Sequence, residues 1–265
     1  MDDLSAPGKP SEAPSFIRPP GLEMAMGLAL FSLCFTVFYG AQIVLFIERV
    51  MTLSPEFIGR AFSLELLRED AFEARWVELS SNGDAIAHVS LWSGLIGLSL
   101  VLFMTWRWKQ KRTRTFLALS PAPWREFVKW TVVFVALFAV LEVIEQLFPD
   151  PENAFMTKVL NSSTNTALLL LGVGVMPALF EEFLLRGLLY GSLRHLLDHH
   201  VTIALVAGLF TLLHPQYEWY IQLLVVLPMG IVLGYARANS GSIWVPVLLH
   251  MLNNCASILL PQFIR

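Results

Sequence analysis

The sequence predicts an all-α protein, a polytopic transmembrane helical bundle with about seven (six to eight) membrane-spanning helices. Hydrophobic residues make up 55% of the 265 residues, charged residues only 15%, and the mean hydropathy is +0.61. Soluble domains carry about 25% charged residues, so the composition is that of a membrane protein. Several apolar runs also approach the roughly 20 residues that a helix needs to cross the hydrocarbon core.

The hydropathy pattern predicts seven spans separated by short polar segments. Their expected ranges are 22–47, 86–106, 128–148, 166–196, 201–214, 218–236 and 242–261.

Composition divides the chain into three parts. Residues 1–20 are polar and rich in proline, which predicts a disordered N-terminal arm. Residues 21–160 are expected to hold the N-terminal spans and an amphipathic surface segment near 55–80, because FSLELLREDAFEARWVELS has apolar residues at helical spacing. Residues 161–265 are expected to form the catalytic membrane core, because most polar residues inside apolar runs lie there.

The loop after the second span predicts the orientation in the membrane. It reads WRWKQKRTRTFLALSPAPWREFVK and is strongly basic, and basic loops stay on the cytoplasmic side. The N-terminus is therefore expected to be cytoplasmic, and a prokaryotic inner membrane suits the short loops. No basic patch interleaved with aromatic residues suggests nucleic acid as a partner.

Two adjacent glutamates lie inside the fourth predicted span, in PALFEEFLLRGLLYG. A charged carboxylate at that depth is disfavoured by about 2.5–3.5 kcal/mol on insertion scales. Glu182 and Arg186 are four residues apart and can pair on one helix face. Glu181 has no cation nearby in the sequence and is a candidate general base. The alternative is that both glutamates only tie helices together.

The two following motifs place histidines in later spans. His214 follows Phe210 by four residues, and His250 precedes Asn254 by four, so each pair shares a helix face. Polar groups inside membranes face the bundle interior. Three helices are therefore expected to bring these side chains and the glutamates into one water-filled pocket, whereas the first two spans show nothing comparable.

Two chemistries fit this set of residues. In the first, Glu181 and His214 activate a water molecule, and His250 and Asn254 stabilise the oxyanion. In the second, the histidines and a glutamate bind zinc, which activates the water. The sequence has no HExxH motif, and each helix offers one histidine at most. We therefore predict no metal site and no cofactor, with a three-helix zinc site as the alternative.

Taken together, EEFLLR, FTLLH and HMLNN match EExxxR, FxxxH and HxxxN motifs in that order. The chain in this respect resembles the CAAX protease and bacteriocin-processing (ABI) family, which includes the Ras-converting CAAX endopeptidases. The resemblance covers roughly residues 165–260.

The resemblance implies an intramembrane endopeptidase of the glutamate type. Glu181 and His214 would act on the water, and His250 and Asn254 would form the oxyanion hole. The supporting members of the motifs would be Glu182, Arg186 and Phe210.

The expected function is hydrolysis of a peptide bond in a membrane-associated protein or peptide, near its end. The substrate would be a prenylated C-terminus, a peptide leader or a C-terminal sorting tail. The alternatives are a non-proteolytic immunity or scaffold protein, a zinc-dependent membrane metalloprotease with the same residues, and a proton-coupled transporter. The transporter predicts internal repeats, which the sequence lacks.

Overall fold

The chain folds as a bundle of helices, in a computed structural model that describes residues 19–147 and 154–264. No strand occurs in these two ranges, so the predicted all-α class is confirmed there. The predicted arm, residues 1–20, lies almost entirely outside the described residues. The elements are α1 Pro20–Leu53, η1 Leu66–Arg68, α2 Asp70–Leu79, α3 Gly83–Lys109, η2 Gln110–Arg112, α4 Thr113–Phe116, α5 Trp124–Leu147, α6 Ala154–Ser162, α7 Thr166–Leu169, η3 Leu170–Val175, α8 Met176–Glu181, η4 Glu182–Leu189, α9 Tyr190–Leu193, α10 His199–Leu212, α11 Trp219–Ile221, η5 Gln222–Val226, α12 Leu227–Ser240 and α13 Trp244–Ile264.

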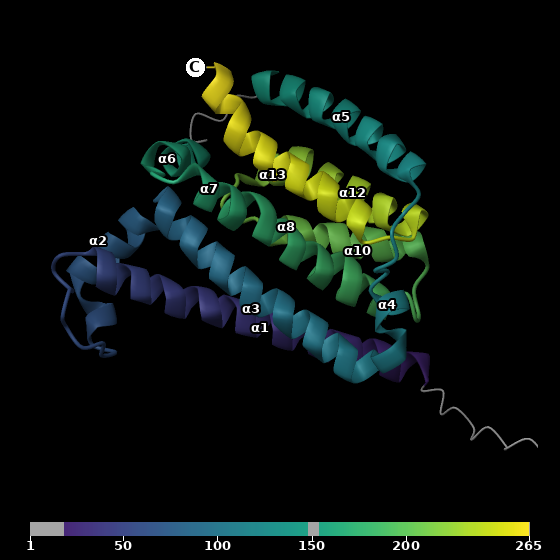
Figure 1. Ribbon diagram of the computed structural model, residues 1–265, viewed down its shortest axis with the longest axis horizontal. Helices are drawn as coiled ribbons and strands as arrows, with labels where there is room; N and C mark the ends of the chain where they lie inside the picture. The colour runs from purple at the N-terminus through teal and green to yellow at the C-terminus, as the bar shows by residue number, and fades with distance from the viewer. Residues whose placement is uncertain (1–18, 148–153, 265) are drawn as a thin grey trace, which may run out of the picture.

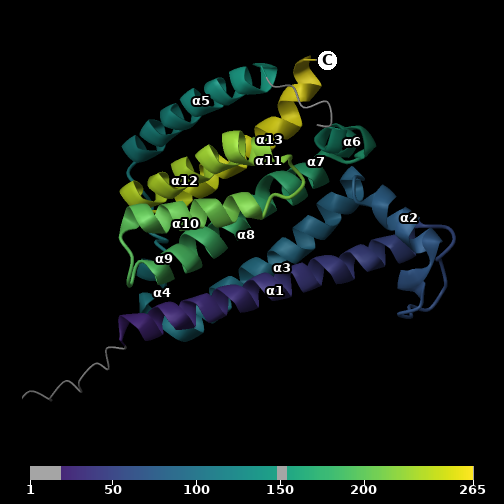
Figure 2. The same ribbon diagram turned by 180° about the vertical axis from the view of Figure 1, so that it is seen from behind.

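The helices are arranged in layers. α1 and α3 pack along each other on one side of the molecule, and α3 also packs on η3 and α8 (Figures 1 and 2). The helix that runs from α7 to α9 and the pair α10–α12 occupy the middle, with α13 against η3 and α8. α5 covers the opposite side, where it contacts α12 and α13. The glutamate-bearing helix is thus enclosed by α1 and α3 on one side and by α13 on the other.

The described helices are apolar and long enough for an integral membrane protein. Four have the length and hydropathy of a membrane span, namely Pro20–Leu53, Gly83–Phe116, Thr166–Leu193 and Trp219–Ser240. His199–Leu212 and Trp244–Leu260 are shorter apolar helices. The third predicted span is the 24-residue α5, whose last side chains lie partly outside the described set. A helix therefore lies in each of the seven predicted ranges, but length and composition support four of these as full spans and two as shorter ones.

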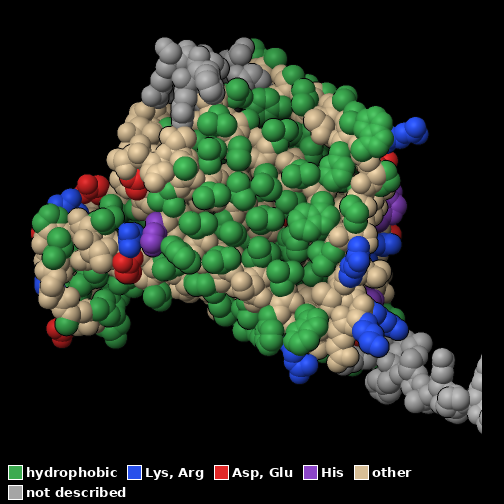
Figure 3. All heavy atoms as spheres, in the orientation of Figure 1, with side chains coloured by type: hydrophobic (Ala, Val, Ile, Leu, Met, Phe, Trp, Pro, Cys, Tyr) green, Lys and Arg blue, Asp and Glu red, His purple; other side chains and the backbone are tan. Residues whose placement is uncertain are grey.

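The molecular surface is mostly hydrophobic, as a lipid-facing surface requires. Hydrophobic side chains cover the broad face in Figure 3, while Lys and Arg side chains gather toward the right edge. Valines on the outer helices are among the most exposed apolar residues, for example Val44 at 65% and Val132 at 64%. A water-soluble surface would not leave so many large apolar side chains open. The orientation of the bundle across the membrane stays a prediction.

The amphipathic segment is shorter than the sequence suggested. Its continuous helix is α2, Asp70–Leu79, and only the three-residue η1 precedes it within 55–80. Phe72 and Leu79 are buried against Val50 and Phe57. Pro55 and Gly59, whose φ of +81° is left-handed, interrupt helical geometry before η1. The segment therefore forms a small cap over the end of α1.

Close contacts between backbones hold the two sides of the bundle together. Cβ atoms built at Gly172 and Gly27 would lie 2.1 Å from the Ala87 carbonyl oxygen and 1.9 Å from Ser192 Oγ, respectively. Small residues of this kind let membrane helices approach and gain van der Waals contact. η3 and α3 consequently touch near Gly172, and α1 and α9 near Gly27.

Gly172→Ala should destabilise the bundle, because its new methyl group meets a backbone carbonyl of α3 that cannot rotate away. Overpacking of this kind typically costs about 1–3 kcal/mol. Gly40→Ala is the matched control, since a Cβ there meets nothing within 4 Å. Thermal unfolding of both variants in detergent micelles measures the difference. Equal stability of the two variants would show that α3 and η3 are not tightly packed.

Candidate active site

The two glutamates lie where the geometry of their helix changes. Glu181 is the last residue of α8, and Glu182 begins η4, a π-helical stretch that runs to Leu189. π-helical turns insert an extra residue into a helix and are frequent at functional sites. Glu181 is only partly buried, whereas Glu182 has no exposed surface. The two neighbours therefore have different environments.

Glu182 is held by two partners from different parts of the chain. Arg186 donates a hydrogen bond from Nη1 to Glu182 Oε1 at 2.9 Å, so the pair expected from the i,i+4 spacing is present. His250 Nδ1, on α13, lies 2.9 Å from the same oxygen. The guanidinium, the carboxylate and the imidazole are 0%, 0% and 2% exposed. A buried charge of this kind needs both a counter-ion and hydrogen bonds.

Arg186 links this cluster to two further helices. Its Nη2 donates to the Gly230 carbonyl of α12 at 3.1 Å. Its guanidinium carbon lies 4.5 Å from the centre of the Phe210 ring on α10, in cation–π contact. We call Glu182, Arg186 and His250 the buried ion cluster, and it joins η4, α10, α12 and α13.

Glu181 points to a cavity instead of to this cluster. The cavity has a volume of about 250 Å³ and is lined by Glu181 and His214, among other residues. Glu181 Oε2 is buried and has no hydrogen-bond partner in the described structure. The Glu181 carboxylate, which lines the cavity, therefore has acceptor capacity that no protein group uses.

His214 reaches the cavity because α10 ends just before it. α10 begins at its N-cap Asp198, whose carboxylate accepts hydrogen bonds from the amides of His200 and Val201. The Val201 amide, followed by that of His200, lowers the pKa of the Asp198 carboxyl below its usual range. At the other end of the helix, Pro215 disfavours helical geometry at His214, the residue before it. α10 therefore stops at Leu212, and His214 lies beyond the helix, at the cavity.

A hydrogen bond to the backbone orients the His214 ring. Its Nδ1 lies 2.7 Å from the Phe210 carbonyl oxygen. Because a carbonyl only accepts, Nδ1 carries the proton, and the neutral ring has its lone pair on Nε2. The Phe210 ring also packs against the His214 ring, with centroids 4.5 Å apart. His214 thus has the tautomer that a general base needs.

His250 and Asn254 lie elsewhere than expected. Neither is among the described residues that line the cavity of Glu181 and His214. His250 turns its Nδ1 to Glu182, and Asn254 donates a long hydrogen bond of 3.5 Å to the Val173 carbonyl. The structure therefore brings Glu181 and His214 into one cavity and places His250 in the buried ion cluster.

The same cavity has a wall that the sequence reasoning missed. Tyr39 and Gln42 of α1 and Ser90 of α3 line it, together with Gln216 from the loop after His214. The sequence of the first two spans predicts no contribution comparable to that of the later motifs. One feature of the sequence could have predicted this contribution from α1. Tyr39 and Gln42 are three residues apart in an otherwise apolar run, which places both on one helix face.

The residues present do not form a metal site. No group of three or more His, Cys, Asp or Glu side chains is placed to hold a metal ion among the residues that were described. The zinc alternative requires two histidines and a glutamate at one point. His250 binds Glu182 through Nδ1 and His214 lies in the cavity with Glu181, so these ligands do not converge.

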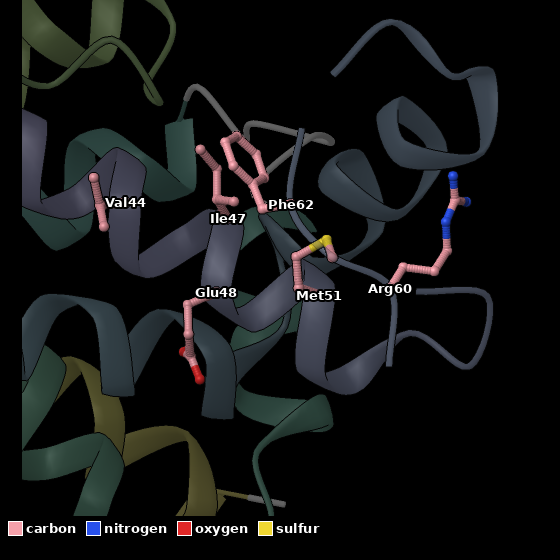
Figure 4. A pocket seen from close by; sticks show the side chains of 6 residues that line it. All are labelled: Val44, Ile47, Glu48, Met51, Arg60 and Phe62. Carbon is pink, nitrogen blue, oxygen red and sulfur yellow. The ribbon is translucent and has the colours of Figure 1, made fainter. Parts of the chain in front are cut away.

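A larger cavity of about 400 Å³ lies further along α1, toward the C-terminal end of that helix. Figure 4 shows Val44, Ile47, Glu48 and Met51 projecting from α1, with Phe62 beside Ile47. Its two charged residues are already paired, Glu48 with Arg49, and Arg60 with Glu69. With apolar walls and neutralised charges, this cavity lacks the groups that chemistry would need.

Arg186→Ala should unfold or strongly destabilise the protein, because Glu182 would keep a buried charge without its cation. Breaking a buried pair in this way costs about 3–5 kcal/mol. Arg75→Ala, which removes the exposed pairs with Glu56 and Glu78, is the control and should change little. Denaturation in detergent micelles measures the stability of both variants relative to the wild type. Equal effects would mean that the buried ion cluster does not support the fold.

Comparison with known proteins finds similarity to a known family in the C-terminal part of the chain. Residues 163–256 match the model of the family described as type II CAAX prenyl endopeptidase Rce1-like. An Escherichia coli protein described as an uncharacterized 24.3 kDa protein is 32% identical over 124 residues, which cover 45% of this chain and 55% of that relative. The chain thus spans about half the length of this curated relative.

No solved structure shows significant similarity to the chain. The matched segment contains Glu181, His214, His250 and Asn254, which confirms the resemblance that the three motifs indicated. Residues 163–256 therefore carry the sequence pattern of the Rce1-like type II CAAX prenyl endopeptidases.

Proposed function

We propose that the protein is an intramembrane endopeptidase that hydrolyses a peptide bond of a membrane-associated protein or peptide. The observation that supports this most directly is the cavity shared by Glu181 and His214 within an apolar helical bundle. The family match of residues 163–256 points to the same class of enzyme. A scaffold would need the buried ion cluster for packing, but it has no need of a second, unpaired carboxylate in a cavity.

In the proposed reaction, Glu181 and His214 activate one water molecule. The Glu181 carboxylate and His214 Nε2 are both acceptors at one cavity, so a water held between them would donate one O–H to each and aim a lone pair at a carbonyl carbon. The water oxygen bonds to that carbon, and a proton passes to Glu181. The C–N bond then breaks, and the leaving nitrogen takes this proton.

We propose His250 and Asn254 as donors to the oxyanion that forms in this reaction, on the strength of the HxxxN motif within the matched segment, since neither residue lines the cavity of Glu181 and His214. A histidine donates from both ring nitrogens only as the imidazolium. Because Nδ1 is bound to Glu182, Nε2 is the ring nitrogen that would donate to the oxyanion. The cluster would then have a chemical as well as a structural role.

The cavity size is consistent with a substrate that enters as an unfolded segment. At about 250 Å³ it is smaller than the roughly 300–1,000 Å³ of pockets that hold drug-sized ligands.

We further propose that the chain is divided as the sequence predicts, into an N-terminal arm at 1–20, N-terminal spans at 21–160 and a catalytic membrane core at 161–265. We also propose that its N-terminus is cytoplasmic and that it lies in a prokaryotic inner membrane.

Glu181→Gln and His214→Ala should each lower cleavage by about 10²–10⁴-fold, because each removes one acceptor for the water. Mass spectrometry of membrane-protein termini in cells that express the wild type or either variant measures cleavage and identifies the substrate. Both variants should still insert and fold.

Glu73→Gln is the matched control for charge removal, since Glu73 is exposed on α2, and it should cleave normally. If the membrane-protein termini in Glu181→Gln cells are the same as those in wild-type cells, the peptidase proposal is overturned in favour of a scaffold. Activity of the purified protein should persist in EDTA; loss that zinc restores would support the metalloprotease alternative.

His250→Ala or Asn254→Ala should lower kcat by about 10²–10³-fold with a smaller change in KM, because oxyanion donors act in the transition state. Steady-state kinetics on a peptide that spans the identified cleavage site measures both constants. A change confined to KM would assign these residues to substrate binding instead.

A further inference from the structure

Part of the lining of the cavity comes from the N-terminal helices, which the family match does not reach. Tyr39 and Gln42 of α1 and Ser90 of α3 line the same cavity as Glu181 and His214. These three residues lie outside 163–256, so the family pattern assigns them no role. Their position next to the proposed reacting groups raises the question of what they bind.

Packing holds this wall in place against the glutamate-bearing helix. The Phe38 ring stacks on the Phe180 ring, with the two centroids 4.0 Å apart. Phe180 directly precedes Glu181 in the sequence. One turn earlier, Cys34 is fully buried, and Gly27 lets α1 touch Ser192 of α9. Gln42 follows Phe38 by one turn, and is therefore held at a defined place relative to Glu181.

The wall is polar but carries no charge. Gln42 offers an amide that donates and accepts, and Ser90 offers a hydroxyl that does the same. A peptide group has one N–H donor and one C=O acceptor, so neutral side chains of this kind match it. Tyr39, which lines the cavity together with Glu181, adds a phenolic hydroxyl.

The charge of the cavity is unfavourable for a free C-terminus. No Lys or Arg is among the described residues that line it, and Glu181 is its only acidic group. A free α-carboxylate there would meet a like charge and no counter-ion, which is unfavourable in a low-dielectric site. An uncharged backbone segment avoids this repulsion.

We propose that Gln42 and Ser90 form a substrate subsite that holds the neutral backbone of the residue next to the scissile bond. The subsite rests on the proposed peptidase function and deepens it. The size of the cavity, about 250 Å³, leaves room for a short extended segment alone. The N-terminal helices then bind the substrate, and the C-terminal helices cut it.

The test uses a synthetic peptide spanning the cleavage site that the cellular experiment identifies, with purified wild type, Gln42→Leu and Ser90→Ala in detergent. Each substitution removes about one hydrogen bond to the backbone, so KM should rise about 3- to 10-fold while kcat changes less than about twofold. Thr36→Val is the matched control, because Thr36 is exposed on α1 and does not line the cavity.

A second measurement tests the charge argument. A peptide that ends one residue after the scissile bond is compared as the free acid and as the C-terminal amide. The wild type should cleave the amide at least about tenfold faster, because the amide brings no charge near Glu181. Equal rates for the two peptides would show that the cavity does not select for neutral backbone.

The outcomes separate this inference from the function on which it rests. Retained cleavage by Glu181→Gln overturns the peptidase itself. If Glu181→Gln is inactive while Gln42→Leu and Ser90→Ala keep the wild-type KM, the subsite is wrong and the peptidase stands. A loss of kcat at unchanged KM, in variants whose thermal unfolding matches the wild type, would also overturn the subsite.

Discussion

The structure depends on the neutralisation of one carboxylate, that of Glu182. Its Oε1 accepts from Arg186 and lies 2.9 Å from His250 Nδ1, in a position with no exposed surface. An unpaired charge at this depth is too costly for a membrane bundle to retain. The partners come from η4 and α13, and Arg186 also binds the Gly230 carbonyl of α12. The contacts of Glu182 Oε1 and Arg186 therefore link three helices, while Glu182 Oε2 and Arg186 Nε have no hydrogen-bond partner in the described structure.

The neighbouring residue, Glu181, has a different environment because it points in a different direction from the helix. Glu181 lies about 100° round the helix from Glu182 and points to the cavity that His214 also lines. Because Arg186 is already committed to Glu182, Glu181 keeps an unpaired acceptor oxygen. One glutamate thus supports the fold, and the other is available for chemistry.

The site also joins the two halves of the chain. The recognisable motifs lie in 163–256, yet α1 and α3 supply polar residues that line the same cavity as Glu181. Contacts such as Phe38 on Phe180, and Gly172 against Ala87, hold these halves together. A separation into an N-terminal membrane part and a catalytic core describes the sequence better than it describes the cavity.

The sequence by itself determined the features that depend on local spacing. The run lengths predicted the helices, and the i,i+4 interval predicted the Glu182–Arg186 pair. Only the tertiary structure decided which helix faces meet. It placed His250 on Glu182, left Asn254 beside Val173, and brought Tyr39, Gln42 and Ser90 to the cavity. The reason is physical: spacing fixes the angle between side chains on one helix, whereas contacts between helices depend on the rotation and depth at which small residues let them pack.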